Sequence, residues 1–369
     1  MPEKKTVNVA VIGCGRVVGH HLRSIDQVEG GRIIAVCDIV PERAEAYAKQ
    51  YDVAAFTNYH EMIRTIPEID VVAIVTPSGM HAEHALDVMR HYGKHILVEK
   101  PTFMHTKQLF EAYDFAEANG LRIYPVFQNR HNKAVQRVKQ AIDGGELGDI
   151  RIMAVRVRWC RPTRYYNLAP WRGTYSHDGG ALSNQGIHHI DLLRYLGGEV
   201  QELSAVLRTL GAEIEVEDAA VATLKYASNA LGVVEVTTAA RPDDFEASLS
   251  IVGGKGLAQL GGLAVNELQV FTPDPAACAQ ASERIPDAYG FGHITVYRNL
   301  VADMRGERPF PVDRQDCLNT LNLLHAFYRS DEINGWVNVW AGRPSNRLGR
   351  PNAKISNLYR TPAPESSAS

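Results

Sequence analysis

The chain has 369 residues, and its 39 Lys and Arg against 42 Asp and Glu give a formal net charge of −3. This balance argues against a dedicated nucleic-acid binder, and 45% apolar with 22% charged residues is typical of an ordinary globular protein. The five cysteines are widely spaced and form no CxxC pair, which argues against a disulfide scaffold and against a structural zinc site.

No apolar run is long enough to cross a membrane, and the charged N-terminus leads directly into a strand pattern. We therefore expect no signal peptide, no membrane partner and no nucleic-acid partner. A cytoplasmic enzyme fits these features.

The first third of the chain alternates short apolar runs with amphipathic stretches. The runs predict buried strands at residues 7–12, 33–37, 53–56, 71–75, 96–98 and 121–124. Helices are predicted between them at 41–49, 81–91 and 107–118, with Pro41 at a first helical position and Gly120 as a helix stop. This alternation predicts a doubly wound parallel α/β domain of the Rossmann type, assigned to residues 1–129.

The rhythm changes after about residue 150, where many segments alternate apolar and polar residues. Strands are predicted at 151–159, 219–226, 231–238 and 247–252, and helices at 187–196, 293–304 and 316–330. These predict an α+β domain with a large, open, mostly antiparallel sheet, assigned to residues 130–340. Residues 341–369 form a C-terminal extension whose end is predicted to be disordered. An open sheet needs its exposed face covered, so we expect a homo-oligomer.

A glycine-rich segment, Gly13-Cys14-Gly15-Arg16-Val17-Val18-Gly19, directly follows the first strand. The first glycine permits a tight turn, and the second lets the backbone approach a pyrophosphate at the helix N-terminus. Val18 stands at the usual third glycine position, so this motif alone is weak.

Asp38 closes the second strand, where an acid can accept hydrogen bonds from both ribose hydroxyls. A carboxylate there would repel a 2′-phosphate, which favours NAD over NADP, although Arg43 lies nearby. The alternative is that Asp38 only caps a helix or forms a turn.

Two further segments end strands at the same ligand-binding edge. Thr76 and Ser78, in Thr76-Pro77-Ser78-Gly79-Met80-His81, could meet the cofactor or cap the next helix. In Glu99-Lys100-Pro101, proline restricts the lysine to extended geometry, and a Lys–Pro bond can be cis.

These motifs together resemble the glucose-fructose oxidoreductase/inositol dehydrogenase/MocA (Gfo/Idh/MocA) family. The resemblance covers roughly residues 7–330 and rests on GCG, Asp38, TPSGMHAEHA, VEKP, Gly144–Gly148, Trp171-Arg172, Gly179-Gly180 and Gly186–Asp191. It implies that Lys100 and His188 serve a reacting sugar hydroxyl and that Trp171-Arg172 lies near the nicotinamide. Asn184 stands where the family usually has an aspartate; an amide cannot be a base, but it can hydrogen-bond a substrate oxygen.

Oxidation of a secondary alcohol needs a base within reach of the hydroxyl, and either His188 or Lys100 could serve. Our hypothesis is that His188 takes the proton while Lys100 polarises the oxygen. Asn184 and His188 are four positions apart, which would place both on one helix face. For His189 we expect a packing or surface role.

The segment 156–166 carries four arginines and clustered aromatic residues, which suit anionic groups and ring faces. We expect Arg156 and Arg158 to face solvent or a subunit interface, and Arg161 and Arg164 to contact a ligand. RWCRPxxYY, PWRGT and GGALSNQGIHHIDLL resemble one branch of the family, the UDP-N-acetyl-2-amino-2-deoxyglucuronate dehydrogenases of the WlbA/WbpB type. This branch oxidises C3 of its nucleotide sugar with NAD, on a route to bacterial surface polysaccharide such as O-antigen.

The resemblance implies a tetramer, a nucleotide-sugar substrate and NAD. The alternatives are another sugar or inositol dehydrogenase of the same family and a non-catalytic NAD-binding regulator. The residues expected to be catalytic are Lys100, His188 and Asn184, and no metal site is predicted. The residues expected to bind the cofactor are Gly13, Cys14, Gly15, Arg16, Val17, Val18, Asp38, Arg43, Thr76, Pro77, Ser78, His81, Glu99, Lys100, Gln128, Trp171 and Arg172. The residues expected to bind substrate are Lys100, Arg161, Arg164, Tyr165, Asn184, His188 and His293.

Overall fold

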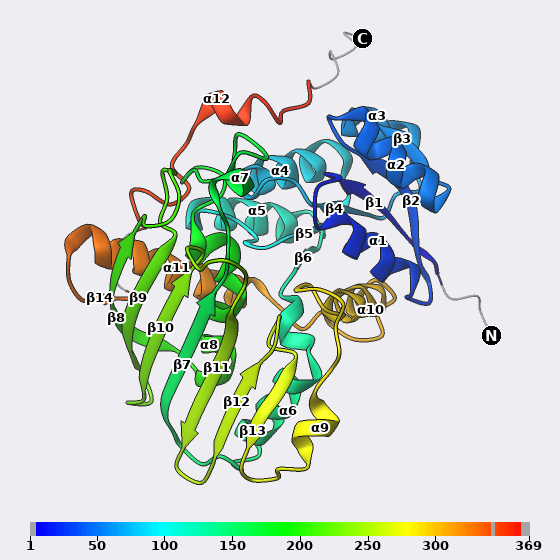
Figure 1. Ribbon diagram of the computed structural model, residues 1–369. Coiled ribbons are helices and arrows are strands. Elements are labelled where there is room, and N and C mark those ends of the chain that lie inside the picture. The colour runs from blue at the N-terminus through cyan, green and yellow to red at the C-terminus, as the bar shows by residue number, and fades with distance from the viewer. Residues whose placement is uncertain (1–4, 341–343, 363–369) are drawn as a thin grey trace.

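The computed structural model describes residues 5–340 and 344–362. In it the first third of the chain forms a parallel sheet with helices (Figure 1). Over these residues its strand order is β3-β2-β1-β4-β5-β6, and every pairing is parallel. The strands are β1 Val7–Ile12, β2 Gly31–Cys37, β3 Ala54–Phe56, β4 Val71–Ile74, β5 His95–Val98 and β6 Ile123–Pro125. The helices are α1 Val18–Asp26, α2 Pro41–Tyr51, α3 Tyr59–Thr65, α4 His81–Tyr92 and α5 Thr106–Ala118. Separate apolar clusters cover the two faces, so the predicted doubly wound fold is confirmed.

The elements of this part of the chain differ from the sequence prediction in some boundaries and in one helix. Strand β6 begins at Ile123, two residues later than predicted. Helix α3 was not predicted, although Asn58 caps it by accepting hydrogen bonds from the backbone N–H groups of His60 and Glu61 at 2.8 and 3.3 Å. Asparagine at an N-cap with glutamate three residues later is a recognisable helix start, so this signal was present in the sequence.

The second half of the chain builds a larger sheet with the order β13-β12-β11-β7-β10-β9-β8-β14. Strands β7 and β10 pair in parallel, and the other pairings in the described residues are antiparallel. The strands are β7 Ile150–Arg158, β8 Val200–Arg208, β9 Ala219–Tyr226, β10 Leu231–Thr237, β11 Glu246–Gly253, β12 Leu257–Gly261, β13 Glu267–Phe271 and β14 Val337–Asn338. The helices are α6 Lys133–Asp143, α7 Thr163–Tyr166, α8 Ile187–Gly197, α9 Ala277–Ala281, α10 Gly292–Met304, α11 Arg314–Ile333 and α12 Ala353–Ser356. The mostly antiparallel sheet is confirmed, while β8, β12, β13 and β14 were not predicted.

Helices α8 and α11 cover one face of this sheet (Figure 1). The other face exposes apolar side chains. The exposed apolar side chains on its strands include Ile152, Val206, Val221, Leu231 and Val233. Within the described ranges, no helix combines the length and apolar character needed to cross a bilayer.

Helix α10 belongs to the second half of the chain but packs against α1 of the first (Figure 1). Val296, Tyr297 and Leu300 share a buried cluster with the strands of the parallel sheet. The chain therefore returns to the parallel sheet after completing the second sheet.

The C-terminal segment 344–362 crosses back toward the first part of the molecule (Figure 1). Its Arg360 forms a two-pronged ion pair with Glu83 of α4 at 2.6 and 2.8 Å. The Pro362 carbonyl accepts a hydrogen bond from Asn58 at 3.3 Å. The tail predicted to be disordered spans residues 361–369. The structure places Thr361 at a cavity and Pro362 against Asn58, and residues 363–369 lie outside the described residues.

Candidate active site

A cavity of about 1660 Å³ lies where the carboxyl ends of the parallel strands meet residues of the second half of the chain. Sites for drug-sized ligands usually measure about 300–1,000 Å³, so this cavity has room for a dinucleotide and a second ligand. It is lined by every residue that the sequence analysis assigned to the site except Val18 and His293.

The glycine loop, residues 13–17, lines one side of the cavity. Gly13 has φ +98°, and a Cβ there would lie 2.6 Å from the Val75 carbonyl oxygen, so only glycine fits. A Cβ on Gly15 would meet nothing within 4 Å, which leaves its backbone open to the cavity. The N-cap of α1, Val17, provides no side-chain hydrogen bond to the first N–H groups. This loop therefore fits a pyrophosphate at a helix N-terminus. The Val18 side chain packs in the core beneath the loop and away from the cavity, because it begins the buried face of α1.

Asp38 stabilises the turn after β2 through its side chain and also lines the cavity. Its Oδ1 accepts a hydrogen bond from Val40 N at 2.8 Å, and its Oδ2 accepts one from Cys14 N at 2.7 Å. Each carboxylate oxygen has a further lone pair, so the side chain can still receive ribose hydroxyls. Burial, with Asp38 adding to it, raises the pKa of the Cys14 thiol to about 12, so this cysteine stays neutral.

Lys100 enters the cavity from the end of β5, just before a cis Lys100–Pro101 peptide bond. Its Nζ donates to the Asn184 backbone oxygen at 2.7 Å and lies 3.4 Å from Asn184 Oδ1. Burial lowers the pKa of Lys100, while Glu99 and Asp178 oppose this change. The ammonium is thus held between polar groups from both halves of the chain.

His188 lines the same cavity and is buried. Its Nε2 accepts a hydrogen bond from Gln128 Nε2 at 3.1 Å, and its Nδ1 has no partner in the described residues. Burial first, and the charge of Lys100 second, hold the pKa of His188 well below its usual value. A neutral imidazole of this kind is able to accept a proton.

Asn184 lies on a π-helical turn, Ala181–Gln185, just before the helix that carries His188. The predicted shared helix face is therefore only approximate, since the two residues belong to different elements. The Asn184 amide nitrogen donates to Asp178 Oδ1, a buried carboxylate that the sequence analysis did not single out. His189 is buried and packs edge-on against Trp159, and it is not among the residues that line this cavity.

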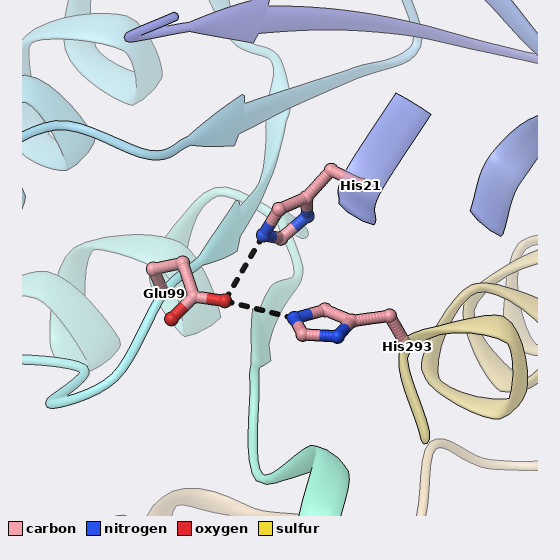
Figure 2. A group of neighbouring side chains, drawn as sticks. All are labelled: His21, Glu99 and His293. Carbon is pink, nitrogen blue, oxygen red and sulfur yellow. Dashed lines mark hydrogen bonds and ion pairs between the residues drawn. The ribbon is translucent and has the colours of Figure 1, made fainter. Parts of the chain in front are cut away.

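His293 was expected to contact substrate, but the structure places it behind the cavity wall. Packing of α10 on α1 turns its imidazole toward Glu99, where Nε2 donates to Oε1 at 3.1 Å. Figure 2 shows His21 pointing at the same carboxylate oxygen, at 3.0 Å. Tyr297 in turn donates to His21 Nδ1 at 2.9 Å, and Glu99 Oε2 accepts from Lys100 N.

His21, Glu99 and His293 form a cluster that the sequence did not reveal. Among the described residues, their side-chain atoms of the kinds that bind metal ions lie within 4.8 Å of one another. The hydrogen bonds drawn in Figure 2 already use the two Nε2 atoms and Oε1. Burial would raise the pKa of Glu99, but the bonds from both imidazoles hold it well below its usual value. Glu99 is therefore a fixed negative charge beside Lys100.

The arginine-rich segment divides between the larger sheet and the cavity. Arg158 pairs with Glu235 and Glu246 on the sheet, and Arg156 is exposed there. Arg161 and Arg164 reach the cavity, where Arg161 pairs with Asp244 at 2.7 Å. 

Tyr165 and Trp171 form an aromatic wall of the same cavity. The Arg172 guanidinium lies over both rings at 4.4 and 4.5 Å. Arg172 Nε is buried without a hydrogen-bond partner among the described residues. An unpaired buried donor of this kind is a place for an anionic or carbonyl oxygen.

Sequence reasoning missed the contribution of the C-terminal extension. Leu358, Tyr359 and Thr361 line the cavity, close in sequence to the Arg360–Glu83 ion pair. Asp287 and Tyr289, from the loop before α10, also line it. The C-terminal extension is short, polar and contains prolines, and nothing in this sequence pattern indicated that it lines the cavity.

A glycine loop at a helix N-terminus, an acid after the second strand, and a lysine and histidine in one cavity define a dinucleotide-dependent oxidoreductase. Models of the oxidoreductase family with an NAD-binding Rossmann fold and of the GFO/IDH/MocA C-terminal domain match residues 7–127 and 135–259. The chain belongs to this Gfo/Idh/MocA family of NAD-dependent oxidoreductases, which act on sugar hydroxyls.

Several members of known identity are similar to the chain. The WlbA dehydrogenase of Bordetella pertussis, solved with NADH and UDP-GlcNAcA, is 33% identical with a TM-score of 0.86, covering 91% of this chain and 99% of that one. The WlbA dehydrogenase of Chromobacterium violaceum, with the same ligands, is 34% identical with a TM-score of 0.83, covering 92% and 97%. The scyllo-inositol 2-dehydrogenase of Bacillus subtilis is 27% identical and covers 70% of this chain and 74% of its own length.

Proposed function

We propose that the protein oxidises the C3 hydroxyl of UDP-N-acetyl-2-amino-2-deoxyglucuronate to the 3-keto sugar with NAD, for bacterial surface polysaccharide. The observation that carries this proposal is the set of arginines in the cavity that holds Lys100 and His188. Arg172 has a buried, unpartnered Nε, and Arg164 has no partner among the described residues. A uronate and a diphosphate would supply the oxygens that these donors lack. The similarity to two WlbA dehydrogenases solved with UDP-GlcNAcA adds independent support.

The roles of the chain's own residues follow from their protonation and contacts. NAD, when bound, accepts the hydride that leaves the carbinol carbon. His188, neutral because it is buried, takes the hydroxyl proton at a ring nitrogen. The Lys100 ammonium stabilises the negative charge that develops on the oxygen. Asp38 holds the ribose hydroxyls, and the glycine loop receives the pyrophosphate.

A second candidate is another sugar or inositol dehydrogenase activity, favoured by the similarity to the scyllo-inositol 2-dehydrogenase. Inositol is neutral, so it would leave Arg164 and Arg172 without an anionic partner. A non-catalytic NAD-binding regulator is a third candidate, and the presence of both Lys100 and His188 weighs against it.

The test is NADH formation by the purified protein with NAD and each candidate substrate. Turnover with the UDP-uronate and none with inositol or free glucose is the expected result. Turnover with only inositol or a free sugar would favour the second candidate, another sugar or inositol dehydrogenase. Tight NAD binding without turnover of any candidate substrate would favour the third, a non-catalytic regulator.

We also propose a homotetramer and a cytoplasmic location. The exposed apolar side chains of the larger sheet support association, and the five free cysteines suit a reducing compartment. Sedimentation analysis at micromolar concentration tests the first point, and a monomeric mass would refute it.

A further inference from the structure

Asn184 occupies the position at which an aspartate is expected, yet a carboxylate still reaches this point of the site. Asp178 comes from the loop six residues earlier and is 1% exposed. Its Oδ1 accepts a hydrogen bond from Asn184 Nδ2, and its Oδ2 accepts one from Gly173 N at 2.6 Å. The carboxylate therefore joins the loop after the aromatic wall to the turn that carries Asn184.

The bond from Asn184 to Asp178 determines which end of the amide faces Lys100. An ionised carboxylate only accepts hydrogen bonds, so the amide nitrogen must point toward Asp178. The amide oxygen then lies on the other side, 3.4 Å from Lys100 Nζ. A flipped amide would set its oxygen against Asp178 and its N–H group against the ammonium, so both contacts would become repulsive.

The charges around Lys100 act in opposite directions on its pKa. Lys100 faces Glu99, Asp178, Arg172, His81 and His188. Asp178 raises the pKa of Lys100, whereas burial and Arg172 lower it. Burial raises the pKa of Asp178, and the hydrogen bonds from Gly173 N–H and the Asn184 amide, with the charges of Arg172 and Lys100, offset only part of this rise. Asp178 and Glu99 are thus the two carboxylates that favour a charged Lys100.

We propose that Asp178 is a positioning residue for the reaction: it orients the Asn184 amide against Lys100, and it supplies from residue 178 the negative charge that an aspartate at 184 would carry. The inference rests on the proposed function in one respect: it assumes that the Lys100 ammonium acts on the reacting hydroxyl. Asp178 itself need not touch substrate or cofactor.

The first test exchanges the two side chains. Asp178→Asn should lower kcat by up to about a hundredfold, because Asn184 can then flip away from Lys100. It should also move the alkaline limb of the kcat/KM profile down by about one pH unit, because Lys100 loses a neighbouring negative charge. The double variant Asp178→Asn/Asn184→Asp restores a carboxylate, now at residue 184. It should return the alkaline limb of the kcat/KM profile to its original pH and recover much of the activity. A loss that is equal at every pH, or a double variant no better than Asp178→Asn, would show that Asp178 only stabilises its loop.

The second test needs no turnover. An amine-specific acylating reagent labels unprotonated lysine, so the labelling rate of Lys100 against pH, followed by peptide mass spectrometry, reports its protonation. Asp178→Asn should become reactive at lower pH than the parent protein. Asp244→Asn, which removes a cavity carboxylate bonded to Arg161, should leave the curve unmoved. An unshifted Asp178→Asn curve overturns the proposal. Failure of every sugar substrate would count against the proposed function and leave this result standing.

Discussion

Glu217 offers a quantitative test of how the turn that carries Asn184 is held. The side chain is buried, and its Oε1 accepts hydrogen bonds from Leu182 N at 3.0 Å and from the Tyr328 hydroxyl at 2.9 Å. Its Oε2 has no partner among the described residues. Burial raises the pKa of Glu217 from 4.5 to about 8. In the unfolded chain the carboxyl loses its proton near pH 4.5, whereas in the folded protein it keeps the proton until about pH 8.

The stability contribution of this group therefore falls as the pH rises between these two values and is constant above and below them. A tenfold change in proton affinity corresponds to about 1.4 kcal/mol, so the loss across this window is at most about 5 kcal/mol. Glu217→Gln keeps an oxygen for Leu182 and Tyr328 but cannot ionise. Its stability should match the parent protein near pH 5 and exceed it near pH 8.5.

Urea denaturation of both proteins, followed by circular dichroism at the two pH values, measures this difference. Because other groups titrate equally in both proteins, the difference between the two pH dependences isolates Glu217. Parallel pH dependences would refute the reasoning, since they would mean that water or a rearranged partner stabilises the ionised carboxylate.

Three further substitutions probe the cavity. His188→Gln should reduce kcat by about 10²–10⁴ with little change in NAD affinity, measured by steady-state kinetics and cofactor titration; near-normal turnover would exclude His188 as the base. Gly13→Ala should abolish NAD binding in calorimetry, because its Cβ would lie 2.6 Å from the Val75 carbonyl at φ +98°; retained affinity would mean that the loop does not hold the pyrophosphate. Arg360→Glu should weaken NADH binding several-fold in a fluorescence titration, because the C-terminal segment lines the cavity, and the double variant Arg360→Glu/Glu83→Arg should restore it. Equal affinity in all three proteins would show that this segment does not contribute to the cofactor site.

The cofactor half of the site could be predicted because its signals are local. Gly13, Gly15 and Asp38 belong to one strand–helix–strand unit, and the strand that precedes Lys100 was recognisable from its apolar run. The contacts that were missed join residues far apart in the chain. His293 was assigned from its place at a helix start, whereas its partner Glu99 lies 194 residues away. No local pattern encodes such a pairing, because it depends on how α10 packs against α1.

The protonation of Lys100 depends on the same long-range packing. Glu99 stands on the parallel sheet, and His21 and His293 bind it from helices that meet only when the second half of the chain returns to the first. Asp178 reaches Lys100 from the other side, through Asn184. Buried charges such as these are screened little by salt, so each carboxylate stabilises the ammonium more than an exposed one would. Since each half of the chain contributes one of the two carboxylates, packing of the halves both buries Lys100, which lowers its pKa, and supplies the charges that oppose this change, and it also completes the cavity that holds His188.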